Sequence, residues 1–129
     1  MKSTSTSEIS TETSKESENI LLHHLHSFAS NDLELLMSDY TDHSILITHE
    51  QTYKGIREIR AFFTELMNHF PKDHSDFTLD KLVSNDDLVF IVWHATTPSL
   101  EVSLGTDTFV IKDGKIMQQT FAGIMNFLS

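Results

Sequence analysis

The sequence contains no cysteine, which excludes disulfides, cysteine nucleophiles and thiolate ligands for a metal ion. It has nine Lys and Arg against nineteen Asp and Glu, which gives a formal charge of -10. This shortage of basic residues argues against nucleic acid or an anionic membrane as a partner, since both bind basic surfaces. No apolar run approaches the roughly 20 residues that a membrane-spanning helix needs.

Glycine is also scarce, with four residues in the chain, and no glycine-rich phosphate-binding loop is present. Neither a GxSxG nucleophile motif nor an HExxH zinc motif occurs. His23 and His26 are spaced to share a metal ion, but no acidic residue lies at a helical offset that would complete the site. We therefore interpret these histidines as a surface cluster and expect no metal and no other cofactor.

The residues that are present suffice for one domain, because the chain has 129 residues and 39% of them are hydrophobic. Residues 1–16 are mostly Ser, Thr and Glu and bury too little apolar surface to offset the entropy lost on ordering. We predict a disordered tail there and a folded domain over residues 17–129. No apolar segment follows Lys2, so a secretory signal is not expected and the predicted location is cytoplasmic.

The spacing of apolar residues predicts three helices, over residues 17–30, 31–40 and 56–70. Asn31 is the expected N-cap of the second helix, with Glu34 in the capping-box position. Residues 51–55 are predicted to form a loop. Strand patterns occupy residues 44–49, 77–84, 88–96, 100–112 and 115–122. The apolar end, residues 123–129, either extends the last strand or covers the mouth of a pocket.

The stretch LGTDTFVIKDGKIMQQTF, residues 104–121, predicts a long hairpin that turns at Asp113-Gly114. Strand alternation places Asp107, Phe109 and Ile111 on one face. A carboxylate among apolar neighbours either reaches solvent at the end of a sheet or lines a pocket that raises its pKa. Helices that precede a long antiparallel meander indicate an α+β fold, with the helices packed on a strongly curved sheet.

Several residues in this order and spacing resemble the SnoaL-like branch of the nuclear transport factor 2-like superfamily. They are Asn31-Asp32-Leu33, Leu36, Tyr40, Asp42, Tyr53, Gly55, Ile59, Phe62-Phe63, Asp107, Phe109 and Asp113-Gly114-Lys115-Ile116. The resemblance spans about residues 20–122. It implies a cone-shaped α+β barrel with a pocket at its wide end, often in a homodimer. The superfamily includes isomerases, cyclases, dehydratases, epoxide hydrolases and non-catalytic binding domains, so the site must identify the chemistry.

Resemblance to ketosteroid isomerase, whose residue roles are well understood, implies roles for particular residues. Asp107 falls at the position of a protonated aspartic acid that stabilises an enolate, and His24 falls at the position of a helix-borne tyrosine. Thr48 falls at the position of the general base, and a threonine cannot abstract a carbon-bound proton at neutral pH. His49 is the substitute base, although strand alternation puts it on the opposite face from Thr48 unless a bulge or the strand end redirects it.

Each candidate also has a structural interpretation. Asp107 can be a strand carboxylate bonded to a neighbouring Thr or backbone N–H, and His24 can be a core histidine that donates to a carbonyl group. A His–carboxylate pair in one place would instead be an acid–base unit. The expected pocket lining consists of Phe28, Tyr53, Phe63, Leu66, Trp93 and Phe109.

We therefore hypothesise a cofactor-independent isomerase, cyclase or dehydratase that acts by acid–base chemistry on a small hydrophobic molecule bearing a carbonyl group. Its catalytic residues would be Asp107, His24 and His49. The alternative is a non-catalytic ligand-binding or dimerisation domain. A third hypothesis is an interaction domain that uses the outer face of the sheet, where Phe90 or Ile91 would be exposed. A homodimer is the expected assembly.

Overall fold

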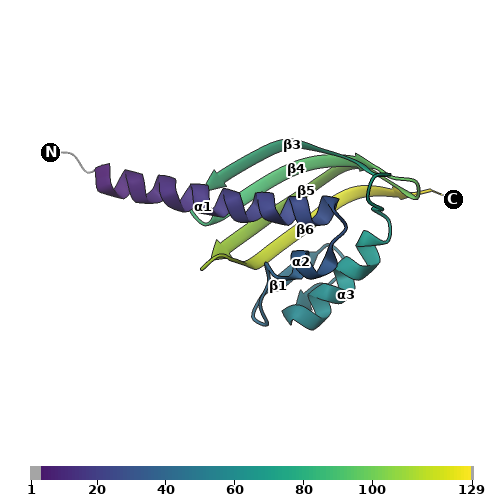
Figure 1. Ribbon diagram of the computed structural model, residues 1–129, viewed down its shortest axis with the longest axis horizontal. Coiled ribbons are helices and arrows are strands. Elements are labelled where there is room, and N and C mark those ends of the chain that lie inside the picture. The colour runs from purple at the N-terminus through teal and green to yellow at the C-terminus, as the bar shows by residue number, and fades with distance from the viewer. Residues whose placement is uncertain (1–3, 129) are drawn as a thin grey trace.

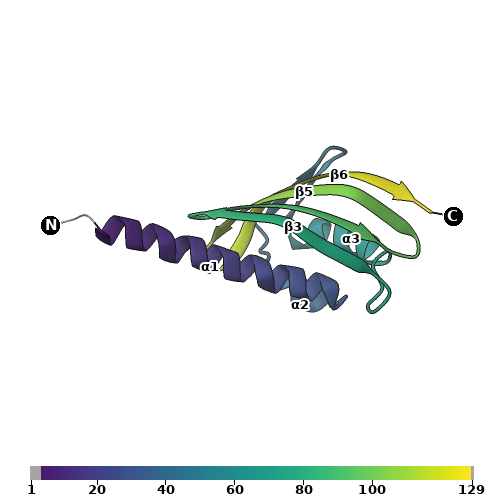
Figure 2. The same cartoon turned by 90° about the horizontal axis from the view of Figure 1, so that it is seen from above.

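The structure is a computed structural model that describes residues 4–128. Over this range it contains the helices α1 (Thr4–Ala29), α2 (Leu33–Met37) and α3 (Gly55–Met67). The strands are β1 (Ile45–Thr48), β2 (Thr52–Lys54), β3 (Asp76–Asn85), β4 (Leu88–Thr96), β5 (Leu100–Lys112) and β6 (Lys115–Phe127). All three helices lie on the same side of a bowed sheet (Figure 2). The predicted α+β fold with helices packed on a curved sheet is confirmed.

The sheet has the strand order β2-β1-β6-β5-β4-β3 and is antiparallel except for the parallel pair of β1 and β6 (Figure 1). Helix α1 packs against β3, β4 and β5, whereas α3 packs against β1 and β2. The β5–β6 hairpin turns at Asp113 and Gly114, whose φ angles of 53° and 74° are both positive. A turn with two positive φ angles is the type that an Asp-Gly pair predicts.

Helix α1 begins at Thr4, well before the predicted start at residue 17. Most of the segment expected to be a disordered tail is therefore helical, and residues 1–3 lie outside the described residues. Two serine hydroxyl groups join this helix to the β3–β4 turn. Ser14 Oγ accepts from the Asp86 N–H at 2.7 Å, and Ser17 Oγ donates to the Asp86 carbonyl at 2.8 Å. Such tertiary bonds support a helix that composition alone would not.

The second helix is capped by Asp32, whose carboxylate accepts from the Leu35 N–H at 3.0 Å, and not by Asn31 as expected. Asn31 adopts a left-handed conformation, φ 53°, which ends α1. Its side-chain amide instead donates to the carbonyl groups of Met67 and Phe70, at 2.9 and 2.7 Å. Asn31 thus ties the end of α1 to the end of α3.

The chain between β1 and α3 is not the loop predicted for residues 51–55, because Thr52–Lys54 pairs with β1 as strand β2. At the other end of the chain, β6 continues to Phe127, so most of the apolar end extends the last strand. The core fills the space between the helices and the inner face of the sheet. It contains Ile91, which is buried, whereas Phe90 is partly exposed on the outer face. Within residues 4–128, no helix is long and apolar enough to cross a membrane.

Candidate active site

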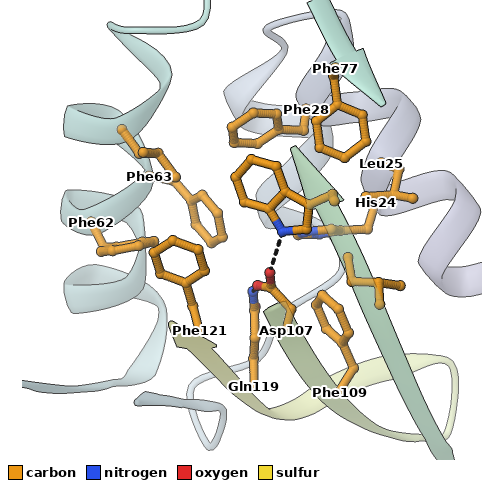
Figure 3. Close-up of a pocket in the computed structure, with 13 residues that line it drawn as sticks. His24, Leu25, Phe28, Phe62, Phe63, Phe77, Asp107, Phe109, Gln119 and Phe121 are labelled. Carbon is orange, nitrogen blue, oxygen red and sulfur yellow. Dashed lines mark hydrogen bonds between the residues drawn. The ribbon is translucent and has the colours of Figure 1, made fainter. Parts of the chain in front are cut away.

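Asp107 is a buried carboxyl group on the inner face of the sheet. Alternation along β5 turns it toward the helices together with Phe109, and its exposed fraction is 7%. Trp93 Nε1, on the adjacent strand β4, donates to Asp107 Oδ1 at 2.8 Å (Figure 3). Gln119 Nε2, on β6, donates to Asp107 Oδ2 at 2.9 Å. Both carboxyl oxygens therefore accept a hydrogen bond from a neutral side chain.

Further contacts hold these two donors in place. The Tyr40 hydroxyl donates to Gln119 Oε1, which turns the amide N–H₂ toward Asp107. The Trp93 indole lies over Gly105, its cross-strand partner, and a Cβ atom at that glycine would come within 2.4 Å of the ring. The absence of a side chain at Gly105 is therefore what lets the indole reach the carboxylate.

Burial raises the pKa of Asp107 from its ordinary value of 3.8 to about 6, against the opposing effect of the hydrogen bonds from Trp93 and Gln119. Of the two environments considered for Asp107, solvent at the end of a sheet and an apolar pocket, the pocket is the one that predicts a raised pKa. At neutral pH the group is mostly a carboxylate, and it takes up a proton readily at slightly lower pH. These are the properties of a general base that works near neutrality.

His24, on α1, lines the same cavity as Asp107 and has an exposed fraction of 4%. Its ring meets the edges or faces of Tyr40, Phe63 and Phe109 at centroid distances of 5.4 to 5.9 Å. Among the described residues, His24 Nδ1 has no hydrogen-bond partner. Burial, assisted by the nearby His23, lowers the pKa of His24 to about 3, so the imidazole is neutral.

The cavity that contains Asp107 and His24 is small, with a volume of about 40 Å³. We call it the inner cavity. Its walls are mainly aromatic, as Figure 3 shows, and a space of this size holds little more than a water molecule or one small chemical group. The structure brings together seven of the sequence-predicted site residues here: Asp107, His24, Phe28, Phe63, Leu66, Trp93 and Phe109.

The other predicted residues lie around a second, larger hollow of about 700 Å³, which we call the outer groove. His49 and Tyr53 line this groove, and Leu66 borders both hollows. His49 is exposed in the turn after β1, which ends at Thr48, so it does not share the inner cavity with Asp107. The Thr48 hydroxyl accepts from the backbone N–H groups of Glu50 and Gln51, at 3.2 Å each, and thus shapes this turn.

Two residues that contact the carboxyl network were not selected from the sequence as site residues. They are Gln119 and Tyr40. Over residues 4–128, no three His, Asp or Glu side chains gather closely enough to hold a metal ion.

A comparison with protein families finds a match to the SnoaL-like domain over residues 21–119. The chain belongs to this family. The match covers most of the chain and includes His24, Asp107 and Gln119. No curated protein sequence matches the chain.

Solved structures with the same fold belong to proteins of several activities. A proposed ketosteroid isomerase from Kribbella flavida DSM 17836 has a TM-score of 0.72 and 11% identity, over 90% of this chain and 83% of that one. A proposed SnoaL-like polyketide cyclase from Shewanella putrefaciens CN-32 has a TM-score of 0.68 and 12% identity, over 83% and 79%. An epoxide hydrolase of the LEH-like type from M. tuberculosis has a TM-score of 0.68 and 11% identity, over 86% and 84%. At these identities the likeness shows the nuclear transport factor 2-like fold alone.

Proposed function

We propose that this SnoaL-like protein is a cofactor-independent acid–base enzyme that isomerises, cyclises or dehydrates an apolar substrate bearing a carbonyl group. The observation that carries the proposal is Asp107: a buried carboxyl group, held at both oxygens, with a raised pKa, in a mainly aromatic cavity. Perturbed carboxyl groups in apolar cavities are typical of general acids and bases.

In this proposal Asp107 removes a proton from the carbon next to the substrate carbonyl. The C–H bond breaks, its electron pair forms the enolate, and the proton moves to the carboxylate. His24, neutral and unpartnered at Nδ1, donates a hydrogen bond to the enolate oxygen in the tautomer that carries the proton on Nδ1. In an isomerisation the proton then returns to another carbon. In a cyclisation the enolate carbon attacks a second carbonyl carbon of the substrate, and the alkoxide that forms takes the proton from Asp107. In a dehydration the enolate expels a hydroxyl group from the neighbouring carbon, which takes the proton from Asp107 and leaves as water.

The role proposed for Asp107 differs from the one implied by resemblance to ketosteroid isomerase, in which this position holds a protonated acid. Trp93 and Gln119 both donate to the carboxyl oxygens, and two donors stabilise the ionised form. The role of substitute base, assigned to His49 from the sequence, passes to Asp107 in this proposal, because His49 lies on the outer groove.

Hydrogen exchange in D₂O tests the proposed proton abstraction without knowledge of the natural product. The protein is incubated with 2-tetralone or 2-dodecanone, and NMR follows the loss of hydrogen next to the carbonyl. We expect exchange above the buffer rate, abolished by Asp107→Asn and retained by Asp39→Asn. Asp39 is a matched control because it is a buried carboxyl outside the inner cavity, bonded to His23 at 3.0 Å. Binding of the ketone without exchange would support the non-catalytic alternative instead.

We also infer a homodimer formed through the outer face of the sheet. Leu104 and Ile124 are cross-strand partners there, with exposed fractions of 42% and 62%, and Phe90 and Val92 are partly exposed on the same face. Exposed apolar side chains that gather on one face are typical of an association surface. Sedimentation velocity should give a dimer for the wild type and a monomer for Ile124→Lys, whereas a wild-type monomer would contradict the inference. The cytoplasmic location stays a prediction.

A further inference from the structure

Three residues line both the inner cavity and the outer groove. Phe62 and Leu66 on α3 and Phe121 on β6 line both hollows. In Figure 3, Phe62 and Phe63 on α3 and Phe121 on β6 extend toward one another on the same side of Asp107. The two hollows are therefore separated by the thickness of a few side chains and not by a layer of backbone.

We call the three residues that line both hollows the partition. Of these, Phe121 lies closest to the Asp107 carboxyl group along the sheet. It is the cross-strand partner of Asp107, and its ring stacks on the Trp93 indole with centroids 6.0 Å apart. The ring edge also lies over Gly123, where a Cβ atom would come within 3.2 Å of Phe121 Cζ. Because Gly123 has no side chain, the space beside the ring stays open on the groove side.

We propose that the outer groove binds the apolar body of the substrate, while only its carbonyl end enters the inner cavity past Phe121. This inference rests on the proposed function. The inner cavity, at about 40 Å³, is too small for a whole substrate, whereas the groove, at about 700 Å³, has the usual size of a ligand pocket. Tyr53, Phe127 and Met125 add apolar surface along the groove.

The charged residues around the outer groove also restrict the charge that the substrate can carry. Glu50 and Glu65 line it, and the described residues of its lining include no Lys or Arg. A negatively charged group in the groove would meet two carboxylates and neither a lysine nor an arginine, with His49 and His69 as the only basic side chains of the described lining. The substrate is therefore an elongated apolar molecule with its carbonyl group near one end and no negative charge on its body.

Competition for the groove tests this assignment with defined probes. Nile red, a neutral apolar dye, reports binding by its fluorescence, and the competitor is 2-dodecanone or 11-oxododecanoate, which has the same chain with a carboxylate at the end far from the ketone. We expect 2-dodecanone to displace the dye and 11-oxododecanoate to do so at least about tenfold less well. Met125→Ser, in the groove, should weaken dye binding about tenfold. Leu128→Ser is the matched control, because Leu128 is an exposed aliphatic residue that lines neither hollow. Equal competition by the two compounds, or no effect of Met125→Ser, would overturn the assignment.

The fluorescence of Trp93 tests the partition, because Trp93 is the only tryptophan in the chain and lines the inner cavity. Phe121→Ala should join the two hollows and raise the acrylamide quenching of Trp93 roughly twofold or more. Phe127→Ala, in the groove but away from the partition, should leave quenching unchanged. If Phe121→Ala fails to fold, Phe121→Leu is used and should give a smaller increase. Unchanged quenching in a folded Phe121 variant would overturn the role of Phe121.

The failure of this inference can be told apart from failure of the proposed function. Asp107→Asn should abolish hydrogen exchange and leave Nile red binding within about twofold. If 2-tetralone, a compact ketone, exchanges hydrogen but 2-dodecanone does not compete with Nile red, the groove assignment is wrong and the proposed enzymatic function stands. If 2-dodecanone displaces the dye but neither ketone exchanges hydrogen, the groove assignment stands and the proposed enzymatic function is wrong.

Discussion

Replacement of Asp107 by Asn should change how the stability of the protein depends on pH. The carboxyl group has a pKa of about 6 in the fold and 3.8 when unfolded, so the folded state holds more protons between these values. Its contribution to stability is fully present below about pH 3.8 and is lost as the pH rises through about 6. At about 1.4 kcal/mol for each pH unit, the contribution amounts to about 3 kcal/mol.

His24 changes the stability of the protein with pH in the opposite direction. Its pKa is about 3 in the fold and 6.5 when unfolded, so the unfolded state holds more protons in this range. The stability that it contributes is present above about pH 6.5 and is lost as the pH falls through about 3. Between about pH 4 and 6 the two groups therefore oppose each other in the wild type. Asp107→Asn leaves the His24 effect unopposed, so the variant should lose about 1.4 kcal/mol more than the wild type for each pH unit of acidification.

Urea unfolding followed by far-ultraviolet circular dichroism, at several values between pH 7 and pH 4, measures this difference. Circular dichroism is preferred because Trp93 fluorescence would itself respond to the loss of the Asp107 carboxylate. Thr120→Asn, at an exposed position of β6, serves as the control, because it neither adds nor removes a titratable group. Its curve should run parallel to that of the wild type. Parallel curves for wild type and Asp107→Asn would refute the raised pKa of Asp107.

Three further substitutions test contacts that hold the structure together, two of them beside the Asp107 carboxyl group and one between α1 and α3. Gly105→Ala should displace the Trp93 indole and cost about 1 to 3 kcal/mol by urea unfolding, and an unchanged midpoint would contradict the close approach of the ring. Tyr40→Phe leaves the amide oxygen of Gln119 without its donor and should cost about 1 to 2 kcal/mol, with slower hydrogen exchange on a bound ketone. Asn31→Ala removes two hydrogen bonds to the end of α3 and should cost about 1 to 3 kcal/mol; an effect below about 0.5 kcal/mol would show that these bonds contribute little.

Local patterns in the sequence predicted the fold and the face that Asp107 shares with Phe109 and Ile111. The Asp-Gly pair fixed the turn, and alternation from Gly105 to Lys112 set the face of each residue in that part of β5. Gln119 was missed because a simple two-residue hairpin would place Thr120 opposite Asp107. The β5–β6 register shifts between Val110 and Ile111, which makes Phe121 the partner of Asp107 and turns Gln119 inward. One extra residue in a strand exchanges its two faces, and no sequence pattern marked that bulge.

Local sequence patterns also did not predict that the start of the chain is helical. Nor did they predict that His49 lies outside the inner cavity. The bonds between Ser14, Ser17 and Asp86 join segments about 70 residues apart, so local composition does not reveal them. His49 follows the last residue of β1, where alternation no longer determines the direction of a side chain. In both cases the outcome depends on tertiary contacts and not on local periodicity.

The pKa of the Asp107 side chain decides whether this carboxyl group is suited to proton transfer. A ¹³C NMR titration of the side-chain carboxyl carbons, with the Asp107 signal assigned by its loss in Asp107→Asn, gives this value for the folded protein. We predict an inflection near pH 6. An inflection near pH 3.8, the ordinary value of an aspartic acid, would contradict the burial and the catalytic role proposed for Asp107.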